Sequence, residues 1–301
     1  MNIITLTTDW GISDNYPAIF KAHLLKEDAS LQIIDITHQV PVNSIDRAAF
    51  LVKNAYHYFP ENSIHIIDVS RHHQQNELKY KIALQNGIEV VEKLPFLDCL
   101  AFRYDKHYFL CENNCIISFL CNRFEIEEIV KLPADKRYAR FTTFKAIPYY
   151  VKAAANLAKG MPLKEMGKQY GIDRIETIPT IRPVVMENKE EDIISFDVQH
   201  IDNYGNIITN LHEDLFKEVA KERTQFGFYN TYLGTIKKQK IAHSYNDSTK
   251  SELLFLFGHS NYLEILTKYA PFDKFILGHN ANHNIRDWKF TIYFKKNENK
   301  E

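Results

Sequence analysis

The chain has 301 residues, of which 45% are hydrophobic and 25% charged, and its 37 Lys and Arg nearly balance 38 Asp and Glu to a net charge of −1. This length is enough for two hydrophobic cores, and the composition excludes collagen-like and largely disordered chains. Because the basic residues are not in excess, we do not expect nucleic acid as a partner.

The first residues and the hydropathy of the chain argue against export or membrane insertion. The segment MNIITLTTDWG has no basic stretch followed by a long apolar run, and no apolar run approaches the ~20 residues that a membrane helix needs. We therefore expect a cytoplasmic protein with no membrane partner. Its cysteines lack CxxC spacing and are expected to be buried free thiols; they are Cys99, Cys111, Cys115 and Cys121.

Apolar β-branched runs alternate with segments of helical period over the first seventy residues. The predicted strands are 3–7, 31–37 and 63–69, and the predicted helices are Tyr16–Leu25, Ile45–Tyr58 and, later in the chain, Pro148–Lys159. Such alternation is typical of parallel strands joined by crossover helices. We therefore expect residues 1–180 to form an α/β domain with an open, mostly parallel sheet flanked by helices.

The pattern changes after residue 180. Residues 181–192 combine a proline with a charge run, which predicts a linker. From 193 to 301, short apolar segments alternate with turn residues, and one helical segment lies near Glu213–Glu222. This part of the chain is expected to be a smaller C-terminal β-barrel domain.

Acidic side chains follow three of the predicted strands. Asp9 and Asp14 follow the first strand, Asp35 lies at the end of the second, and Asp68 lies at the end of the third. Ligands of open parallel sheets bind outside the carboxyl ends of the strands, which favours a binding site here. An Asp at a strand end also commonly caps a helix or forms a turn, so each of them alone fits either role.

Several segments occur together in a fixed order: TTDWGISDNY, DITHQV, FPENSIHIID, TTFK, HIDNYGNIITN and HSNYLEI. With them the chain resembles the S-adenosylmethionine (SAM) hydroxide adenosyltransferases, also called SAM hydrolases, which are related to the fluorinases and chlorinases. The resemblance runs from Thr7 to about Thr267. It implies an α/β domain followed by a β-barrel, a homotrimer, and a SAM site between the N-terminal domain of one subunit and the C-terminal domain of its neighbour. SAM is then the substrate, and no cofactor is expected.

The resemblance also implies which residues bind this nucleoside. SAM carries a ribose diol, a zwitterionic methionine end and a sulfonium cation, so its site needs carboxylates and hydrogen-bond donors. The matching positions are Asp9 for the ribose, Asp14 and Asp202 near the methionine ammonium, Tyr204 and Asn206 for the adenosine, and His259 and Ser260 for the methionine carboxylate.

The implied reaction is an in-line displacement at the ribose 5′ carbon by water, for which the family uses an Asp, an Arg and a His. Asp68 matches the acid, but the segment DVSRHHQQN replaces the usual DPGVG-type loop, and only Arg71 offers a guanidinium there. Lys145 stands where the histidine is expected, and it can pair with Asp68 instead. His72 and His73 either supply the missing base or are solvated loop histidines.

The sequence therefore predicts transfer of the adenosyl group from SAM to water, which gives adenosine and L-methionine. The lost histidine leaves two alternatives: a catalytically impaired protein that binds SAM or adenosine, and a trimeric scaffold without a ligand. No metal site is predicted, because His279 and His283 have the spacing of a helical metal pair without the glutamate of an HExxH motif.

Overall fold

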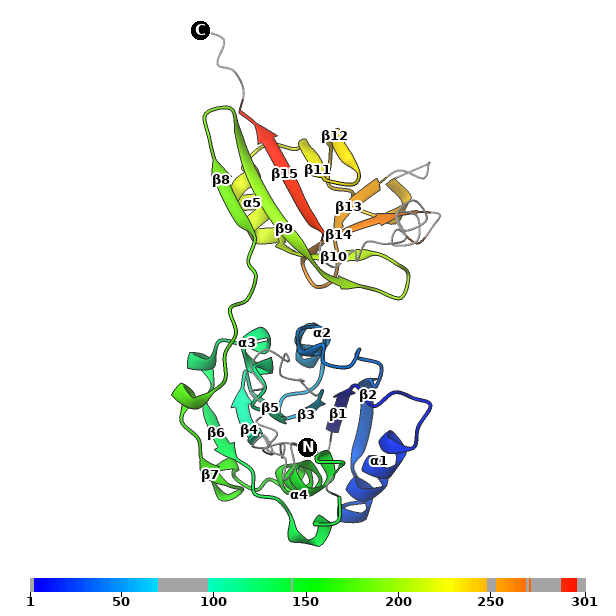
Figure 1. Cartoon of the computed structure of the whole chain (residues 1–301), viewed down its shortest axis with the longest axis vertical. Coiled ribbons are helices and arrows are strands. Elements are labelled where there is room, and N and C mark those ends of the chain that lie inside the picture. The colour runs from blue at the N-terminus through cyan, green and yellow to red at the C-terminus, as the bar shows by residue number, and fades with distance from the viewer. Residues whose placement is uncertain are drawn as a thin grey trace, which may run out of the picture. The chain divides into compact units, whose positions relative to one another are not determined.

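The computed structural model describes residues 3–69, 97–141, 143–247, 253–268, 271 and 288–296. The chain divides into two compact units, Met1–Thr180 and Ile181–Glu301 (Figure 1). Each unit has its own hydrophobic core, and the two are described separately below.

The first unit is built on a seven-stranded sheet in the order β2-β1-β3-β5-β4-β6-β7. Its strands are β1 Ile3–Thr8, β2 Gln32–Thr37, β3 Ile64–Asp68, β4 Cys99–Tyr104, β5 His107–Glu112, β6 Glu128–Lys131 and β7 Lys168–Gln169. β1 is parallel to β2 and β3, and β3 is parallel to β5. β4 is antiparallel to β5 and β6, and β6 is antiparallel to β7.

The α/β class is therefore confirmed, but the sheet is mixed rather than mostly parallel. The reason is the tight hairpin between β4 and β5. Its two turn residues, Asp105 and Lys106, have φ values of 45° and 65°. Two consecutive positive φ values are typical of the two-residue turns that reverse a strand within a hairpin.

Helices cover both faces of this sheet. The helices are α1 Tyr16–Glu27, α2 Ile45–Lys53, α3 Ile116–Leu120 and α4 Ala146–Ala158, with short 3-10 helices η1 Tyr56–Tyr58, η2 Arg123–Glu125, η3 Lys136–Tyr138, η4 Leu163–Glu165 and η5 Ile172–Arg174. α1 and α4 pack on one face of the sheet, where Phe20 and Tyr150 are fully buried. α2 and α3 pack on the other face. The sheet is thus the central one of three layers, as Figure 1 shows.

The second unit is a nearly closed, barrel-like antiparallel sheet. Its strands are β8 Val184–Glu187, β9 Glu191–Ile201, β10 Ile207–His212, β11 Phe226–Asn230, β12 Gly234–Gln239, β13 Leu253–Phe257, β14 Tyr262–Thr267 and β15 Lys289–Lys295; its helices are α5 Glu213–Ala220 and η6 Tyr245–Asp247. The strand order is β12-β11-β15-β9-β10-β14-β13, with β8 paired to β9. A single bridge between Ile241 and Phe255 links the segment after β12 to β13, so the two ends of the order meet.

Residues 181–192, predicted as a linker, contribute strand instead. They hold β8 and the first residues of β9, and Val184 lies opposite Ser195 in an antiparallel ladder. Pro183 precedes β8, and proline is compatible with the start of an edge strand because no ladder hydrogen bond is lost there. Among the described helices, none is long and apolar enough to cross a membrane.

The four cysteines are free, as the sequence predicts. Cys99, Cys111 and Cys115 are buried, whereas Cys121 is partly exposed. Burial raises the pKa of Cys99 and of Cys121 to about 12, and it also raises that of Cys111. These thiols are therefore uncharged at neutral pH.

A chain of buried polar side chains crosses the first sheet from β1 to β5. The Thr5 hydroxyl lies 2.7 Å from His65 Nδ1, and His65 Nε2 lies 3.2 Å from His107 Nδ1. His65 is fully buried. Burial, and secondarily the nearby His107, lowers the pKa of His65 to about 3, so the folded unit holds this imidazole neutral.

We predict that His65 makes the fold sensitive to acid. The unfolded chain binds a proton at this ring below its ordinary pKa of 6.5, whereas the folded chain does not, so the contribution of His65 falls as the pH falls from about 6.5. The stability difference between the wild type and His65→Gln should therefore shrink by about 2 kcal/mol between pH 7 and pH 5, as measured by urea unfolding. The control is His57→Gln, because His57 is exposed. A difference that grows on acidification contradicts the prediction.

Candidate functional site

Three carboxylates emerge side by side at the carboxyl ends of β1, β3 and β5. Thr8 lies opposite Asp68, and Ile67 lies opposite Cys111, so Asp9, Asp68 and Glu112 end neighbouring parallel strands. Ile66 and Leu110 point into the core beneath α1 and α4. Since side chains alternate along a strand, Asp68 and Glu112 leave the sheet on that same face. The sequence predicted Asp9 and Asp68 at this edge, and it missed Glu112.

An aromatic cluster supports Asp68. Trp10 Nε1 donates a hydrogen bond of 2.8 Å to Asp68 Oδ2. The Trp10 ring stacks on His38 at 5.8 Å and meets the edge of Phe144 at 4.8 Å. Phe20, fully buried, lies 5.2 Å from the same indole. Because these rings restrict Trp10, its donor fixes the direction in which the Asp68 carboxyl faces.

Asp68 holds a proton far more readily than an ordinary aspartate. Burial, followed by the negative charges of Glu112 and Asp9, raises the pKa of Asp68 from 3.8 to about 7, although the Trp10 hydrogen bond and Lys145 oppose the rise. A carboxyl group that titrates near neutral pH can both take up and release a proton under working conditions. Asp68 therefore has the property required of a general base or acid.

Lys145 does not pair with Asp68, the partner considered from the sequence. Its Nζ donates to Glu112 Oε1 at 2.8 Å and to the backbone oxygen of Leu97 at 2.6 Å, and it lies 5.7 Å from the Tyr149 ring centroid. Burial lowers the pKa of Lys145, but the hydrogen bond and the negative charge of Glu112 oppose burial, and the net pKa is raised. Lys145 is thus a cation held in place and is not available as a base.

Asp14 and Asp35, the other described acidic residues predicted in the first unit, are not part of this group. Asp14 is exposed in the loop that precedes α1. Asp35 forms an ion pair with Lys21, and its Oδ1 lies 3.1 Å from His38 Nε2. Arg71, His72 and His73 lie outside the described residues, as do His279 and His283 of the second unit. Among the described residues, no three His, Cys, Asp or Glu side chains gather as a metal ion requires.

In the second unit, Asp202 organises the loop between β9 and β10. Asp202 Oδ1 accepts hydrogen bonds of 2.9 Å from the backbone N–H groups of Tyr204 and Asn206, and Oδ2 accepts one of 2.8 Å from Asn206 Nδ2. Asn206 Nδ2 also donates to the Tyr245 hydroxyl at 2.9 Å. Since each carboxylate oxygen accepts about two hydrogen bonds, Oδ2 can accept one more besides the bond from the described residues.

Next to this loop lies a cavity of about 610 Å³. Asn206 and the rings of Tyr204 and Tyr245 line it, together with Thr267 and Lys268. Tyr204 is 77% exposed, whereas Asn206 is buried. An exposed ring beside a buried amide offers a stacking face and a hydrogen-bonding edge, as a nucleobase requires. The sequence predicted Tyr204 and Asn206, and it missed Tyr245.

Two further polar groups of the second unit are buried, and neither has a hydrogen-bond partner among the described residues. Glu264 on β14 is 8% exposed, and no donor among the described residues reaches its carboxyl; burial, and then Asp202, raises its pKa to about 6. Ser260 Oγ is buried without a hydrogen-bond partner in the described structure. His259, the predicted neighbour of Ser260, is exposed. Glu264 lies in the segment HSNYLEI, where a charged residue between apolar neighbours was the available signal.

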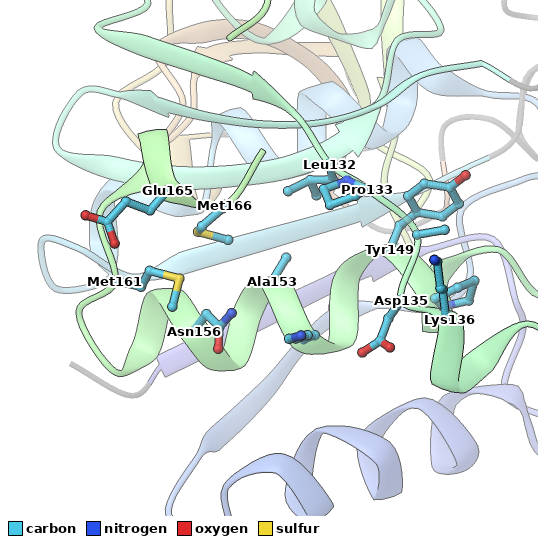
Figure 2. A pocket seen from close by; sticks show the side chains of 13 residues that line it. Leu132, Pro133, Asp135, Lys136, Tyr149, Ala153, Asn156, Met161, Glu165 and Met166 are labelled. Carbon is cyan, nitrogen blue, oxygen red and sulfur yellow. The ribbon is translucent and has the colours of Figure 1, made fainter. Parts of the chain in front are cut away.

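A separate groove of about 560 Å³ runs along α4. Figure 2 shows Ala153 and Asn156 on the helix, with Leu132, Pro133 and Met166 facing them. None of the strand-end carboxylates lines this groove. It is therefore not the candidate site.

The comparisons with known proteins agree with both units. Residues 4–91 match the SAM hydroxide adenosyltransferase N-terminal domain, and residues 196–275 match the C-terminal domain of the same family. The chain belongs to the SAM hydroxide adenosyltransferase family. The first match lies within the first unit and the second match within the second unit, which confirms the resemblance seen in the sequence.

Individual members of the SAM hydroxide adenosyltransferase family and its relatives are distant in sequence. The (R)-S-adenosyl-L-methionine hydrolase of Methanocaldococcus jannaschii is 24% identical over 280 residues, which are 88% of each chain. The fluorinase of Actinoplanes sp. is 22% identical over 74% of this chain and 76% of its own. The crystal structure of an uncharacterized conserved protein from Thermotoga maritima superposes with a TM-score of 0.75, at 22% identity, over 96% of this chain and 99% of that one. This last likeness shows the shared fold alone.

We predict that the contribution of Asp68 to the stability of the folded protein decreases as the pH rises. Its folded pKa lies above its unfolded value, so the folded chain holds the extra proton between about pH 4 and pH 7, and that stability is lost as the pH rises through about 7. Relative to the wild type, Asp68→Asn should gain roughly 2 kcal/mol in free energy of unfolding between pH 5 and pH 8. Asp14→Asn is the exposed control. A gain that is larger at pH 5 than at pH 8 contradicts the prediction.

We also predict that Asp202 stabilises the loop before β10. Asp202→Ala removes the acceptor of three hydrogen bonds and should cost about 1–3 kcal/mol of stability, with faster amide exchange at Tyr204 and Asn206. Hydrogen exchange followed by NMR measures both amides directly. Asn203→Ala, in the same loop and exposed, should leave the exchange rates unchanged. Unchanged exchange in Asp202→Ala means that the loop is held by other contacts.

Proposed function

We propose that this chain hydrolyses S-adenosylmethionine to adenosine and L-methionine by transferring the adenosyl group to water. Membership of the family and the similarity to two (R)-S-adenosyl-L-methionine hydrolases support this proposal. The observation that carries it is the Asp9, Trp10 and Asp68 arrangement. It combines a carboxyl that titrates near neutral pH with a fixed orientation at the ligand-binding edge of the sheet.

In the proposed reaction, a water oxygen attacks the ribose 5′ carbon as the bond from that carbon to sulfur breaks. The electron pair of this bond stays on sulfur, so the sulfonium becomes the neutral thioether of methionine. The water loses one proton to the Asp68 carboxylate, which later releases it to solvent. Orientation of the nucleophile and removal of its proton are the contributions expected of the protein. No cofactor takes part in this proposal.

For substrate binding, the proposal keeps the residues implied by the resemblance. Asp9 binds the ribose hydroxyls, Asp14 and Asp202 face the methionine ammonium, and His259 and Ser260 face the methionine carboxylate. Two features of the described residues support these roles: Asp202 Oδ2 accepts a single hydrogen bond from them, and the buried Ser260 hydroxyl lacks a partner among them. Glu264 adds a second carboxyl near Asp202.

The adenosine is proposed to stack on Tyr204 and to bond to Asn206 beside Tyr245. As the resemblance implies, we propose a homotrimer in which the residues of the first unit and those of the second come from neighbouring subunits. Static light scattering tests this directly, since the mass should be that of three chains. The cytoplasmic location and the roles of Arg71 and His72 stay predictions.

One observation favours a second function, a SAM- or adenosine-binding protein with little catalysis. Lys145, which replaces the histidine expected in the family, is bound to Glu112 and Leu97 and cannot serve as a base. The hydrolase and the binding protein differ only in whether bound SAM is converted to adenosine and methionine. A trimeric scaffold, the third alternative, binds neither ligand, so calorimetry with SAM and adenosine separates it from both.

We predict that the purified protein converts SAM to equal amounts of adenosine and methionine, resolved by chromatography against a heat-killed control. Because Asp68 must be ionised to accept a proton, the rate should rise with pH through about 7. Asp68→Asn should lower the rate by about 100-fold or more, whereas the exposed Asp46→Asn on α2 should not change it. SAM binding without adenosine release supports the binding protein, and the absence of binding supports the scaffold.

A further inference from the structure

We propose that Glu112 is a further positioning residue of this site: it holds Lys145 away from the substrate, and the charge balance of the two decides whether Asp68 carries a proton at neutral pH. The inference rests on the proposed role of Asp68. Glu112 and Lys145 act here as a pair, and neither residue alone sets the charge balance around Asp68.

The contacts of Lys145 show that the pair is built into the fold. The ammonium has two acceptors from two different places in the chain, the Glu112 carboxylate at 2.8 Å and the Leu97 carbonyl at 2.6 Å. The side chains of Lys145 and Glu112 are only 18% and 16% exposed. An ion pair that is shielded from water to this degree interacts more strongly than a surface pair.

The position of Glu112 places its charge beside Asp68. The two residues end adjacent parallel strands, one residue beyond the Ile67 and Cys111 pair, and they leave the sheet on the same face. Glu112 is the strongest negative influence on Asp68, ahead of Asp9, and Lys145 opposes it. The charges of Glu112 and Lys145 therefore act on Asp68 in opposite directions: Glu112 raises the pKa of Asp68, and Lys145 lowers it.

Among the described residues, the other groups that face Asp68 come from the end of β1, from β4 and from α4. Asp9 and Trp10 follow β1, Cys99 begins β4, and Tyr150 lies on α4. Burial raises the pKa of Cys99 to about 12, and Tyr150 is raised well above its usual value, so both are neutral at pH 7. Asp9 is then the remaining charged neighbour among the described residues, besides the pair.

The pair also removes an electrostatic conflict. A lysine ammonium next to a sulfonium cation would weaken binding of the substrate, because like charges repel. Bound to Glu112, Lys145 has its charge compensated and its ammonium directed to Leu97 and Glu112. The site thus keeps the negative charge of ionised Asp68 for a cationic nucleoside.

This assignment predicts opposite effects of the two single substitutions. Glu112→Gln removes a negative charge and leaves Lys145 uncompensated, so Asp68 should lose its proton at lower pH. Lys145→Met leaves Glu112 uncompensated, so Asp68 should keep its proton to higher pH. Each shift should be roughly half to one pH unit, and the double variant should return toward the wild type.

Trp10 offers a readout of Asp68 that does not depend on activity. The chain has only two tryptophans, so in full-length Trp288→Phe protein the fluorescence comes from Trp10, whose indole donates to Asp68. The change in Trp10 fluorescence with pH that is lost in Asp68→Asn is assigned to the titration of Asp68. Its midpoint is compared among Glu112→Gln, Lys145→Met, the double variant and the charge-preserving control Glu112→Asp, each shown by circular dichroism to be folded.

Adenosine release by the same set of variants is measured across the same pH range. Midpoints that move in opposite directions, with a rate profile that follows them, support the proposal. Midpoints that stay fixed or move in one direction overturn it, even if SAM is hydrolysed. Opposite shifts without adenosine release from any form instead refute the proposed function and leave the Glu112 assignment intact.

Discussion

The structure of the first unit depends on one electrostatic constraint, the placement of like charges at one edge of a sheet. Parallel pairing of β1, β3 and β5 brings their carboxyl ends together, and each of these strands ends in an acid. Such carboxylates cannot all be ionised and unpaired at low cost. The fold resolves this in two ways: Asp68 takes up a proton more readily, and Glu112 binds a lysine.

These two solutions suit different tasks. A paired carboxylate has its charge compensated and its position fixed, which contributes to the structure and to the charge balance around a substrate. A carboxyl near its titration point can exchange a proton, which serves chemistry. Trp10 links the second task to the packing of the domain, because its ring is held among Phe20, His38 and Phe144 while its nitrogen holds Asp68. The nearby core therefore takes part in setting the geometry of the Asp68 carboxyl.

Local patterns were sufficient to predict the fold and part of the site. Hydrophobic periodicity located β1, β3 and α1, and the position of Asp9 and Asp68 after strands indicated the site. The same rule applied to β5 would have found Glu112, and the Asp105–Lys106 turn was the signal for the antiparallel hairpin. The partner of Lys145 could not be predicted, since it depends on two contacts distant in sequence. By contrast, Asp202 is engaged by residues only two and four positions along the chain, a local turn that its place after a strand could have indicated.

The free cysteines have a practical consequence. Thiol reagents attack the thiolate, and the raised pKa of Cys99, Cys111 and Cys121 keeps that form scarce at neutral pH, while Cys115 is buried. A cysteine introduced at the exposed position of Tyr204 would thus be far more reactive than the native thiols. The wild-type background is already suited to attaching one probe beside the cavity of the second unit, without first removing its own sulfhydryl groups.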